Sequence, residues 1–582
     1  MTGRVPSTQK SQEPWRQRLI RSLLYGRNVD RTAKARARVG FVMLAFVAIY
    51  AVIGGRLVMF ATGADSRSAR HSASQDAIAT ARPDILDRNG EVLATDVKAP
   101  SLFGEPRRII DKEEAIELLT ATLPDLDTAE VRERLSGRKG FVWLKREITP
   151  RQQQEIHRLG IPGIGFLREN KRVYPSGNEV AHLIGLVNID NQGIAGMEKW
   201  LDTNGLADLH RAGFATDRLQ NPVELSVDLR VEHALRDELQ KAKDKFHAKA
   251  ASGLVTNVRT GEVIAMISLP DFDPNNPKEA HDPDRINRLT TGVYEMGSTF
   301  KAFTLAMALD TGKYDLDSLW DARGPLHYGK FAIHDDEPKG RFLTMKEVFT
   351  FSSNVGAARI ALAQGVDAHK AFLRKMGQLD RLRTELPESA SPIVPRHWGD
   401  LNTITIAFGH GIAVAPLQAV MGVSALVNGG YLIPPTFLKR TEAEAMQLAT
   451  RVIKPETSEK MRFLMRLNAE VGTARKADVK GYYIGGKTGT AEKVINGRYA
   501  KRRVLTAFTA ILPVDKPRYQ VLIMLDEPQP LKETYGFITS GWNAVPTAGN
   551  VISRIAPLLD VEPRFDLPPS DRLILAASKT TQ

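Results

Sequence analysis

The sequence predicts an α+β protein in which both ends of a large domain build one antiparallel sheet and helices fill the interval. Apolar, strand-like segments occur in two groups, at Gly253–Val258 and Val263–Ser268, and then at Gly481–Gly485, Val504–Leu512 and Gln520–Leu525. Between them helical periodicity is found at Ser298–Leu309, Met345–Leu362 and Leu417–Val427. Strands at both ends with helices between favour a single sheet with a helical insert.

An apolar run precedes this domain. Residues 39–60 are uncharged except for Arg56, and about 20 mostly apolar residues suffice to span a bilayer as a helix. Arg56 lies near the end of the run, where a long side chain can reach the interface. Because the basic flank comes first, we expect an uncleaved anchor with a cytoplasmic N-terminus and an exported body. A cleaved signal peptide, whose apolar region is usually shorter, is the alternative.

Charge and composition limit the classes of function. The formal net charge is +13, but residues 1–38 hold ten Lys and Arg against Glu13 and Asp30, a local excess of eight. The basic balance therefore belongs mostly to the tail, which argues against a nucleic-acid-binding body. The chain has no cysteine. Disulfides, cysteine metal sites and cysteine nucleophiles are thereby excluded.

Composition divides the 582 residues into five parts. We expect a cytoplasmic basic tail (1–38) followed by a transmembrane anchor (39–60). A pedestal-like domain (61–222), a sheet-containing domain (223–557) and a C-terminal tail (558–582) come after it. In the third part, residues 61–80 are small and polar, as in a stalk. Asn89-Gly90 predicts a hairpin, and helices are expected at Lys112–Leu123 and Arg151–Leu159. This part has no pattern of metal ligands or nucleophiles and is interpreted as a spacer or docking module.

The first chemical motif is Ser298-Thr-Phe-Lys301. Gly297 permits a tight turn, and Ser298 opens an apolar helix, so its hydroxyl lies at the positive end of the helix dipole. Lys301 follows by one helical turn and can reach that hydroxyl. A lysine in a partly desolvated site loses affinity for its proton and can act as a base. The pattern alone is weak, since Ser7–Lys10 also matches it and a helix N-cap with a solvated lysine is the ordinary interpretation.

Ser352-Ser-Asn354 is the second motif. Ser352 can relay a proton between Lys301 and a leaving amine, and Asn354 can fix the lysine and a substrate amide. An ordinary turn or helix cap is the alternative interpretation.

Lys487-Thr488-Gly489-Thr490 is the third and most specific motif. If it lies on an inner strand beside a cleft, Gly489 lets substrate approach the backbone closely. The Thr488 and Thr490 hydroxyls, with Lys487, can bind a substrate carboxylate. The backbone N–H groups of Thr490 and Ser298 can form an oxyanion hole. The three motifs in this order predict a serine acyl-transfer enzyme that uses lysine in place of histidine.

Other candidates are weaker. His334-Asp-Asp-Glu337 could hold a metal, but no second cluster completes it, and a solvated loop is the preferred interpretation. We therefore expect no metal and no cofactor.

With these motifs the chain resembles a class B penicillin-binding protein from the anchor to about residue 557. The likeness extends to segments outside the three motifs: Arg82–Ala94, Arg172–Gly185, Gly193–Glu198, Asp273–Asn276, Asn287-Arg288 and Thr490–Lys493. The resemblance implies a penicillin-binding transpeptidase fold, an antiparallel sheet flanked by helices with an all-helical subdomain, on an extended pedestal. The Ser-x-Asn form of the second motif resembles the division type, penicillin-binding protein 3, rather than the elongation type.

The resemblance also implies an activity and partners. Ser298 would attack the penultimate D-alanine carbonyl of a peptidoglycan stem peptide, and an amine of a neighbouring stem would resolve the acyl-enzyme during septal wall synthesis. β-Lactams would acylate the same serine. The implied partners are a SEDS-family glycosyltransferase of the FtsW type and other division proteins of the inner membrane. The catalytic domain would be periplasmic.

Departures and rival hypotheses remain. Met296 stands where the family often has proline, and His410 where an aromatic residue is common. A D,D-carboxypeptidase or β-lactamase-type hydrolase would use the same motifs with water as the acceptor. A non-enzymatic scaffold or β-lactam sensor is the second rival, although all three motifs are intact.

Overall fold

The computed structural model describes residue 15 and residues 31–62, 82–137, 139–205, 221–495 and 497–566. The chain forms two compact units, 1–80 and 81–582. Most of the predicted basic tail, the stalk after residue 62, and the C-terminal tail from residue 567 lie outside the described residues.

In the described part of the first unit lies a long helix, α2 (Arg31–Thr62), which includes the whole predicted anchor. Its segment Val39–Arg56 is long and apolar enough to cross a membrane. Large apolar side chains of this segment, such as Phe41, Leu44 and Tyr50, are exposed. An exposed apolar surface on a helix of this length is what a bilayer would cover.

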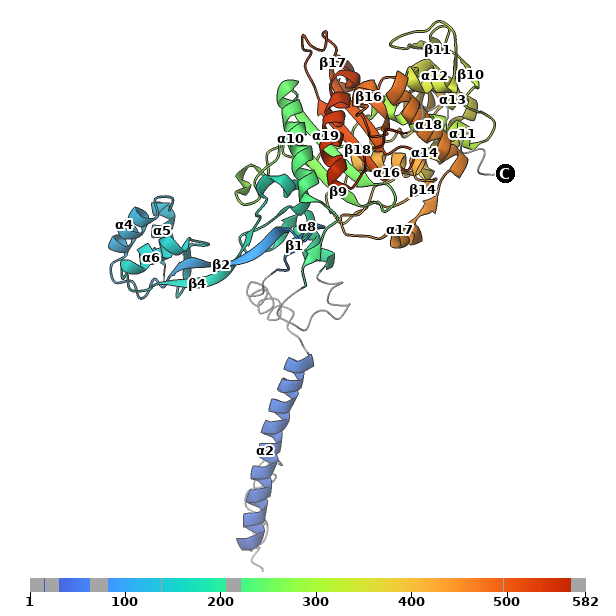
Figure 1. The fold of residues 1–582 in the computed structure, drawn as a ribbon. Helices are drawn as coiled ribbons and strands as arrows, with labels where there is room; N and C mark the ends of the chain where they lie inside the picture. The colour runs from blue at the N-terminus through green and yellow to red at the C-terminus, as the bar shows by residue number, and fades with distance from the viewer. Residues whose placement is uncertain are drawn as a thin grey trace, which may run out of the picture. The chain divides into compact units, whose positions relative to one another are not determined.

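The second unit begins with the pedestal (Figure 1). β1 (Ile85–Leu86) and β2 (Val92–Gly104) form the hairpin predicted at Asn89-Gly90. β2 pairs along its length with β4 (Ile164–Val173), and its end also pairs with β3 (Val142–Lys145). Three helices pack on this end of the sheet, α4 (Lys112–Thr122), α5 (Thr128–Ser136) and α6 (Pro150–Arg158). The helices predicted for α4 and α6 are confirmed.

A buried ion network braces the other end of the pedestal. Arg172 Nε donates to Glu198 Oε1 at 2.7 Å, and Arg82 Nε donates to Glu198 Oε2 at 2.9 Å. Asp96 accepts from Arg172, and Asp202 accepts from Arg82. The side chains of Arg172 and Glu198 are fully buried, and a buried charge is tolerated only when it is paired. Two of the segments that carry the family likeness, Arg172–Gly185 and Gly193–Glu198, therefore meet in this network.

Short elements complete the pedestal around this network. They are η1 (Gly177–Val180), α7 (Ala181–Ile184), β5 (Leu186–Val187), β6 (Gly193–Ala195), α8 (Gly196–Trp200), the π-helical turn η2 (Leu201–Gly205) and β7 (Val223–Glu224), which pairs with β1.

The catalytic sheet confirms the predicted arrangement, because its strands come from both ends of the domain. The antiparallel order is β16-β17-β18-β8-β9. The strands are β8 (Ala250–Asn257), β9 (Val263–Leu269), β16 (Gly485–Ile495), β17 (Arg498–Leu512) and β18 (Tyr519–Asp526). The prediction of a strand at Gly481–Gly485 is wrong, because Gly481 has φ +89° in a turn and β16 begins only at Gly485. β16 is also an edge strand, not the inner strand that we expected.

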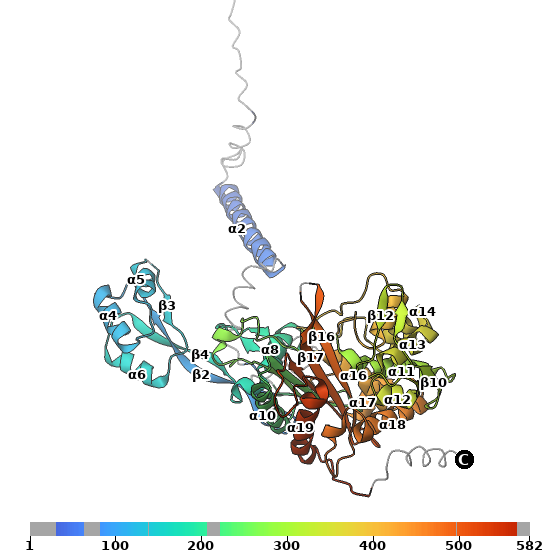
Figure 2. The same cartoon turned by 90° about the horizontal axis from the view of Figure 1, so that it is seen from above.

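Helices cover both faces of this sheet (Figure 2). Along β18, Val521 and Ile523 pack toward α10 (Leu229–Lys245) and α19 (Ala544–Leu558), whereas Leu522 and Met524 face the opposite core. Successive strand residues point to opposite faces, so one strand serves two cores. The opposite core contains α11 (Lys301–Asp310), α16 (Pro416–Val427) and α18 (Pro455–Val471).

The helical insert differs from the prediction at one point. The single helix expected at Met345–Leu362 is two helices, α12 (Met345–Thr350) and α13 (Asn354–Gln364). Ser352 lies between them with φ +57°, a left-handed conformation that ends a helix. The insert also contains α14 (Val366–Lys375), α15 (Asp400–Ile406), α17 (Glu442–Leu448), and the short strands β10 (Leu319–Asp321), β11 (Leu326–Tyr328), β12 (Phe331–Ile333), β13 (Phe342–Thr344), β14 (Tyr431–Leu432) and β15 (Thr450–Arg451). Four 3₁₀ turns complete the domain, η3 (Pro277–Glu279), η4 (Gly297–Phe300), η5 (Arg475–Ala477) and η6 (Ser540–Trp542).

Candidate active site

Ser298 and Lys301 lie where η4 continues into α11. Lys301 Nζ lies 2.9 Å from Ser298 Oγ, one helical turn apart, as the spacing predicts. Lys301 is fully buried. Gly297 has φ +53°, and a Cβ at this residue would lie 2.8 Å from the carbonyl oxygen of Thr490. Only glycine permits this turn so close to β16.

The second motif forms the turn between α12 and α13. Lys301 Nζ lies 3.0 Å from Ser352 Oγ and 2.7 Å from Asn354 Oδ1, and it also contacts the carbonyl oxygen of Ser352. The strained φ of Ser352 aims both its hydroxyl and its carbonyl at the lysine. Two segments 51 residues apart in the chain thus converge on one nitrogen.

Lys487 reaches the same group from the sheet. Its Nζ lies 2.9 Å from Ser352 Oγ and 3.2 Å from the carbonyl oxygen of Thr488, and the residue is fully buried. The structure therefore brings Ser298, Ser352 and Asn354 together around Lys301 Nζ, and Lys487 joins this group through the Ser352 hydroxyl.

The remaining residues of the third motif line two faces of β16. Lys487 and Gly489 share one face, opposite Thr488 and Thr490. A Cβ at Gly489 would lie 2.5 Å from the carbonyl oxygen of Met296. The protein's own chain therefore requires glycine here, in addition to the close approach of substrate that we expect.

The two threonine hydroxyls have partners that the sequence did not indicate. Thr488 Oγ1 lies 2.7 Å from Thr473 Oγ1, and Thr490 Oγ1 accepts from the N–H of Ser540 at 3.1 Å. Ser540 is itself fixed, because its Oγ donates to the carbonyl of Ala507 on β17. No spacing in the sequence connects Thr473 or Ser540 with the third motif.

Burial and like charge set the electrostatics. Burial lowers the pKa of Lys301 to about 7, and the carboxylates of Asp335 and Asp336 oppose that shift. Burial, together with the charge of Lys301, holds the pKa of Lys487 well below its usual value. Two ammonium groups that contact one hydroxyl repel each other, so the pair does not hold two full charges at neutral pH.

Asp335 is a functional residue that the sequence analysis missed. Its carboxylate accepts from Ser353 Oγ at 2.7 Å and from the N–H of Val355 at 2.9 Å, and Asn354 Nδ2 donates to the carbonyl of His334 at 3.0 Å. Our expectation of a solvated loop at His334–Glu337 is therefore partly wrong, because this segment fixes the Ser352–Asn354 turn. In the described part of the chain no group of three or more His, Asp or Glu side chains is arranged to hold a metal ion.

Comparison with known proteins agrees with this geometry. A model of the penicillin-binding protein transpeptidase domain matches residues 251–541, and a model of the penicillin-binding protein dimerisation domain matches residues 77–204. The probable peptidoglycan D,D-transpeptidase FtsI of Caulobacter vibrioides is 40% identical over 512 residues, with 86% of this chain and 85% of that protein covered. The chain belongs to the class B penicillin-binding proteins.

Further similar proteins support the activity and the subtype. Peptidoglycan D,D-transpeptidase FtsI of Escherichia coli K12 is 30% identical, with 84% of this chain and 85% of that protein covered. This chain is accordingly a serine-type peptidoglycan D,D-transpeptidase of the FtsI division type. A crystal structure of penicillin-binding protein 3 from Mycobacterium tuberculosis with aztreonam has a TM-score of 0.63 at 23% identity, covers 84% of this chain and 98% of that chain, and shares the fold.

The two departures from the class B pattern have structural neighbours. Met296 is buried, and its carbonyl accepts from Thr299 Oγ1 at 2.8 Å within η4. The ring of His410 stacks on Tyr499 of β17, with 5.4 Å between the ring centres. The Tyr499 hydroxyl lies 3.2 Å from Glu295, which precedes Ser298 by three residues. His410 thus joins β17 to the chain that carries Ser298.

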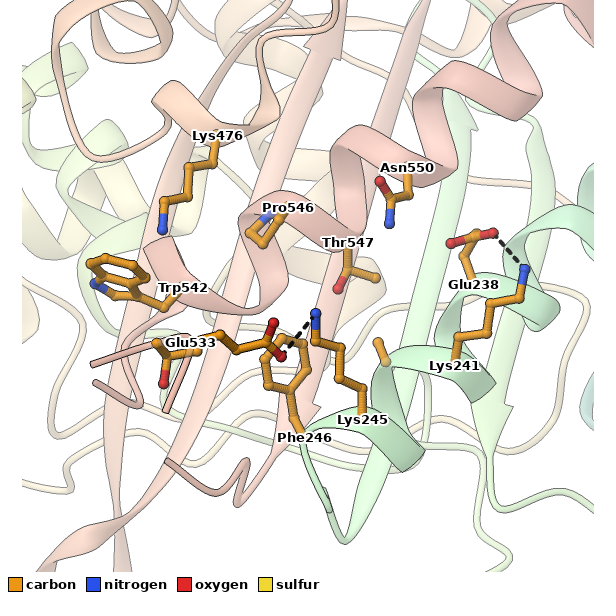
Figure 3. Close-up of a pocket in the computed structure, with 12 residues that line it drawn as sticks. Glu238, Lys241, Lys245, Phe246, Lys476, Glu533, Trp542, Pro546, Thr547 and Asn550 are labelled. Carbon is orange, nitrogen blue, oxygen red and sulfur yellow. Dashed lines mark hydrogen bonds and ion pairs between the residues drawn. The ribbon is translucent and has the colours of Figure 1, made fainter. Parts of the chain in front are cut away.

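A separate cavity of about 270 Å³ lies among α10, η5, η6 and α19 (Figure 3). None of the predicted site residues lines it. Lys245 pairs with Glu533 at 3.1 Å, Lys241 pairs with Glu238 at 3.0 Å, and Lys476 Nζ lies 3.1 Å from the ring centre of Trp542. Its three lysines already have partners within the protein, so the cavity has no part in the proposals below.

Proposed function

We propose that Ser298 is the nucleophile of this transpeptidase and that neutral Lys301 accepts its proton. The observation that supports the proposal is the 2.9 Å distance from Lys301 Nζ to Ser298 Oγ, at a fully buried lysine whose pKa lies near neutrality. A general base works best when its pKa is close to the working pH.

In the acylation step, Ser298 Oγ attacks the carbonyl carbon of the penultimate D-alanine. The C–N bond to the terminal D-alanine breaks, and the serine proton reaches the leaving amine through Lys301 and Ser352. Ser352 can relay this proton because Lys301 and Lys487 both contact its hydroxyl. The N–H groups of Ser298 and Thr490 stabilise the negative charge on the carbonyl oxygen.

Substrate binding uses the rest of the third motif. The Thr488 and Thr490 hydroxyls donate to the terminal carboxylate of the stem. Lys487 lies beneath them, and the arriving carboxylate favours its charged form. Asn354 orients Lys301 and the amide of the substrate. β-Lactams carry a similar carboxylate and acylate the same serine.

The second half-reaction distinguishes a cross-linking enzyme from a hydrolase. An amine of a neighbouring stem attacks the acyl-Ser298 ester, the ester C–O bond breaks, and the amine proton returns to Ser298 through Lys301. The pedestal and the apolar helix α2 support a membrane-held enzyme that meets a growing polymer. We propose a cytoplasmic N-terminus, a periplasmic catalytic domain at 223–557, a pedestal at 61–222 and a SEDS-family glycosyltransferase as partner.

Labelling with a fluorescent penicillin tests the nucleophile. The full chain in detergent is expected to be labelled, and Ser298→Ala is expected to abolish the label without unfolding the protein. Labelling of the mutant at the original rate would place the nucleophile elsewhere. Product analysis with a donor stem peptide and an acceptor amine tests transfer, since free acid alone would favour the hydrolase.

A further inference from the structure

The hairpin of β16 and β17 concentrates positive charge. We call residues 492–504 the basic hairpin: it holds Lys493, Arg498, Lys501, Arg502 and Arg503 against one acid, Glu492. Since eight of the thirteen net charges belong to residues 1–38, the rest of the chain carries a net charge of only +5. The basic hairpin alone contributes four of these. The net charge of the body is thus largely confined to thirteen residues.

The backbone of the basic hairpin is irregular where these charges lie. Glu492 pairs with Val504, but its neighbour Lys493 pairs with Ala500. The three residues Lys501, Arg502 and Arg503 of β17 therefore fall between two adjacent residues of β16. A bulge bends a strand and re-aims its side chains. Here the bulge consists of basic residues only.

The arginine side chains of the basic hairpin are available to a ligand. Arg498 and Arg502 are exposed, and within the described residues neither has a carboxylate at ion-pair distance. The Arg503 side chain is 61% exposed, and its Nε lies 3.9 Å from Glu527. That carboxylate is already bound by Lys493 at 2.7 Å. Cations kept unpaired on a surface raise the local concentration of anions.

The basic hairpin lies next to the catalytic groups. Tyr499, between Arg498 and the bulge, stacks on His410 and bonds to Glu295, three residues before Ser298. The cross-strand partner of Tyr499 is Val494, and both side chains are about half exposed. In Figures 1 and 2 the two strands run out beyond the helices that flank the sheet. The hairpin thus presents apolar surface and arginines beyond the part of β16 that carries the third motif.

We propose that the basic hairpin binds the carboxylates of the uncross-linked polymer, so that it holds a strand whose stems enter the active site one after another. The inference rests on the proposed function, in which every unreacted donor stem ends in a D-alanine carboxylate. A polymer of such stems is a row of anions, and a second contact to one strand is far stronger than the same contact to a free stem. Arginine binds carboxylates in a bidentate geometry that lysine lacks.

The test is a binding and cross-linking assay with the full chain in neutral detergent. The double variant Arg498→Glu/Arg502→Glu is compared with the wild type, and Lys313→Glu/Arg383→Glu, two exposed basic residues outside the hairpin, serves as the charge-matched control. We expect the hairpin variant to bind uncross-linked strands about 10-fold more weakly at low ionic strength, with a smaller difference in about 0.5 M salt. The milder double variant Arg498→Gln/Arg502→Gln should lose less of this strand binding.

Two further readouts separate the possible outcomes. Acylation by a fluorescent penicillin, a small ligand, should change less than about twofold, because the hairpin contacts reach only a polymer. Strands with amidated stem carboxylates should bind all variants equally. The proposal is overturned if charge reversal leaves strand binding unchanged, if amidated strands lose binding equally, or if only binding to anionic lipid vesicles is lost. Strand binding needs no catalysis, so failure of labelling in the wild type would refute the proposed function separately.

Discussion

Lys301 and Lys487 contact the same oxygen atom, the hydroxyl of Ser352, at 3.0 and 2.9 Å. The two lysines come from a helix and from an edge strand, and both are fully buried. A hydroxyl can accept and donate at once, so Ser352 can pass a proton between the two nitrogens. In the proposed mechanism the arrangement couples the base of the first half-reaction, Lys301, to Lys487 beneath the carboxylate site. It also makes the charge state of the lysine pair depend on pH.

Replacing Lys301 by alanine is expected to reduce the rate of penicillin acylation by about 10³-fold, because general base catalysis typically supplies 10²–10⁴. Lys301→Arg should be similarly inactive, since a guanidinium cannot release its proton at neutral pH. Circular dichroism checks that both variants fold. Acylation at near wild-type rate in Lys301→Ala would exclude the lysine as the base.

On the acid side of its pH–rate profile, the rate of acylation should follow the deprotonation of Lys301. Its pKa of about 7 means that the rate rises as the pH increases through neutrality. Asp336 is exposed and raises the pKa of Lys301 by its charge. Asp336→Asn should therefore move the acid side of the profile to lower pH, while Glu337→Gln, at the next exposed residue, should not. A pH–rate profile decides, and identical profiles for all three proteins would contradict the electrostatic coupling.

A methyl group at position 489 should separate β16 from η4. The Cβ of Gly489→Ala would lie 2.5 Å from the Met296 carbonyl and 2.9 Å from Thr299 Cγ2. A displacement of this size at a catalytic group costs on the order of 10²-fold in rate. Gly324→Ala is the control, because no atom lies within 4 Å of the added Cβ. Equal acylation rates in the two variants would show that the contact is not needed.

Arg172→Met should destabilise the pedestal. The substitution leaves the buried carboxylates of Glu198 and Asp96 without this partner, and breaking a buried pair costs about 3–5 kcal/mol. Arg132→Met removes an exposed pair with Glu113 and should leave the melting temperature almost unchanged. Thermal unfolding of the full chain measures both, and similar melting temperatures would contradict the proposed weight of the buried network.

Glu232 should make the stability depend on pH. Burial raises the pKa of this carboxyl to about 8, against the bond that it accepts from the Met266 N–H. The folded state thus holds the proton more tightly than the unfolded state does. The contribution of protonated Glu232 to the free energy of unfolding is full below about pH 4.5 and is lost as the pH rises toward 8. Glu232→Gln should flatten the fall in melting temperature between pH 5 and 8; a parallel fall in both proteins would rule this out.

Local sequence was sufficient for much of the structure. The helix α16 and the Asn89-Gly90 hairpin lie where periodicity and turn chemistry predict them. Lys301 reaches Ser298 because a spacing of three residues is one helical turn, which no tertiary contact can change. The prediction of a strand at Gly481–Gly485 failed, because the local sequence does not distinguish a glycine in a turn from a glycine at the start of a strand.

Residues far apart in the chain could not be connected in this way. Asp335 lies 18 residues from Ser353, and Ser540 lies 50 residues from Thr490. Each has an ordinary loop sequence around it, and what connects it to a distant motif is hydrogen bonding that only the fold creates. The same is true of Tyr499, which reaches Glu295 across 204 residues.

The sequence by itself determined the order of the three motifs and the pairing of Ser298 with Lys301, which we propose as nucleophile and base, because these depend on residue type and on spacing within single elements. Only the tertiary structure decided that β16 is an edge strand, that Gly489 is required by the chain's own carbonyl, and that two lysines share one hydroxyl. Packing between elements decides these relationships, and packing depends on distances that the order of residues does not record.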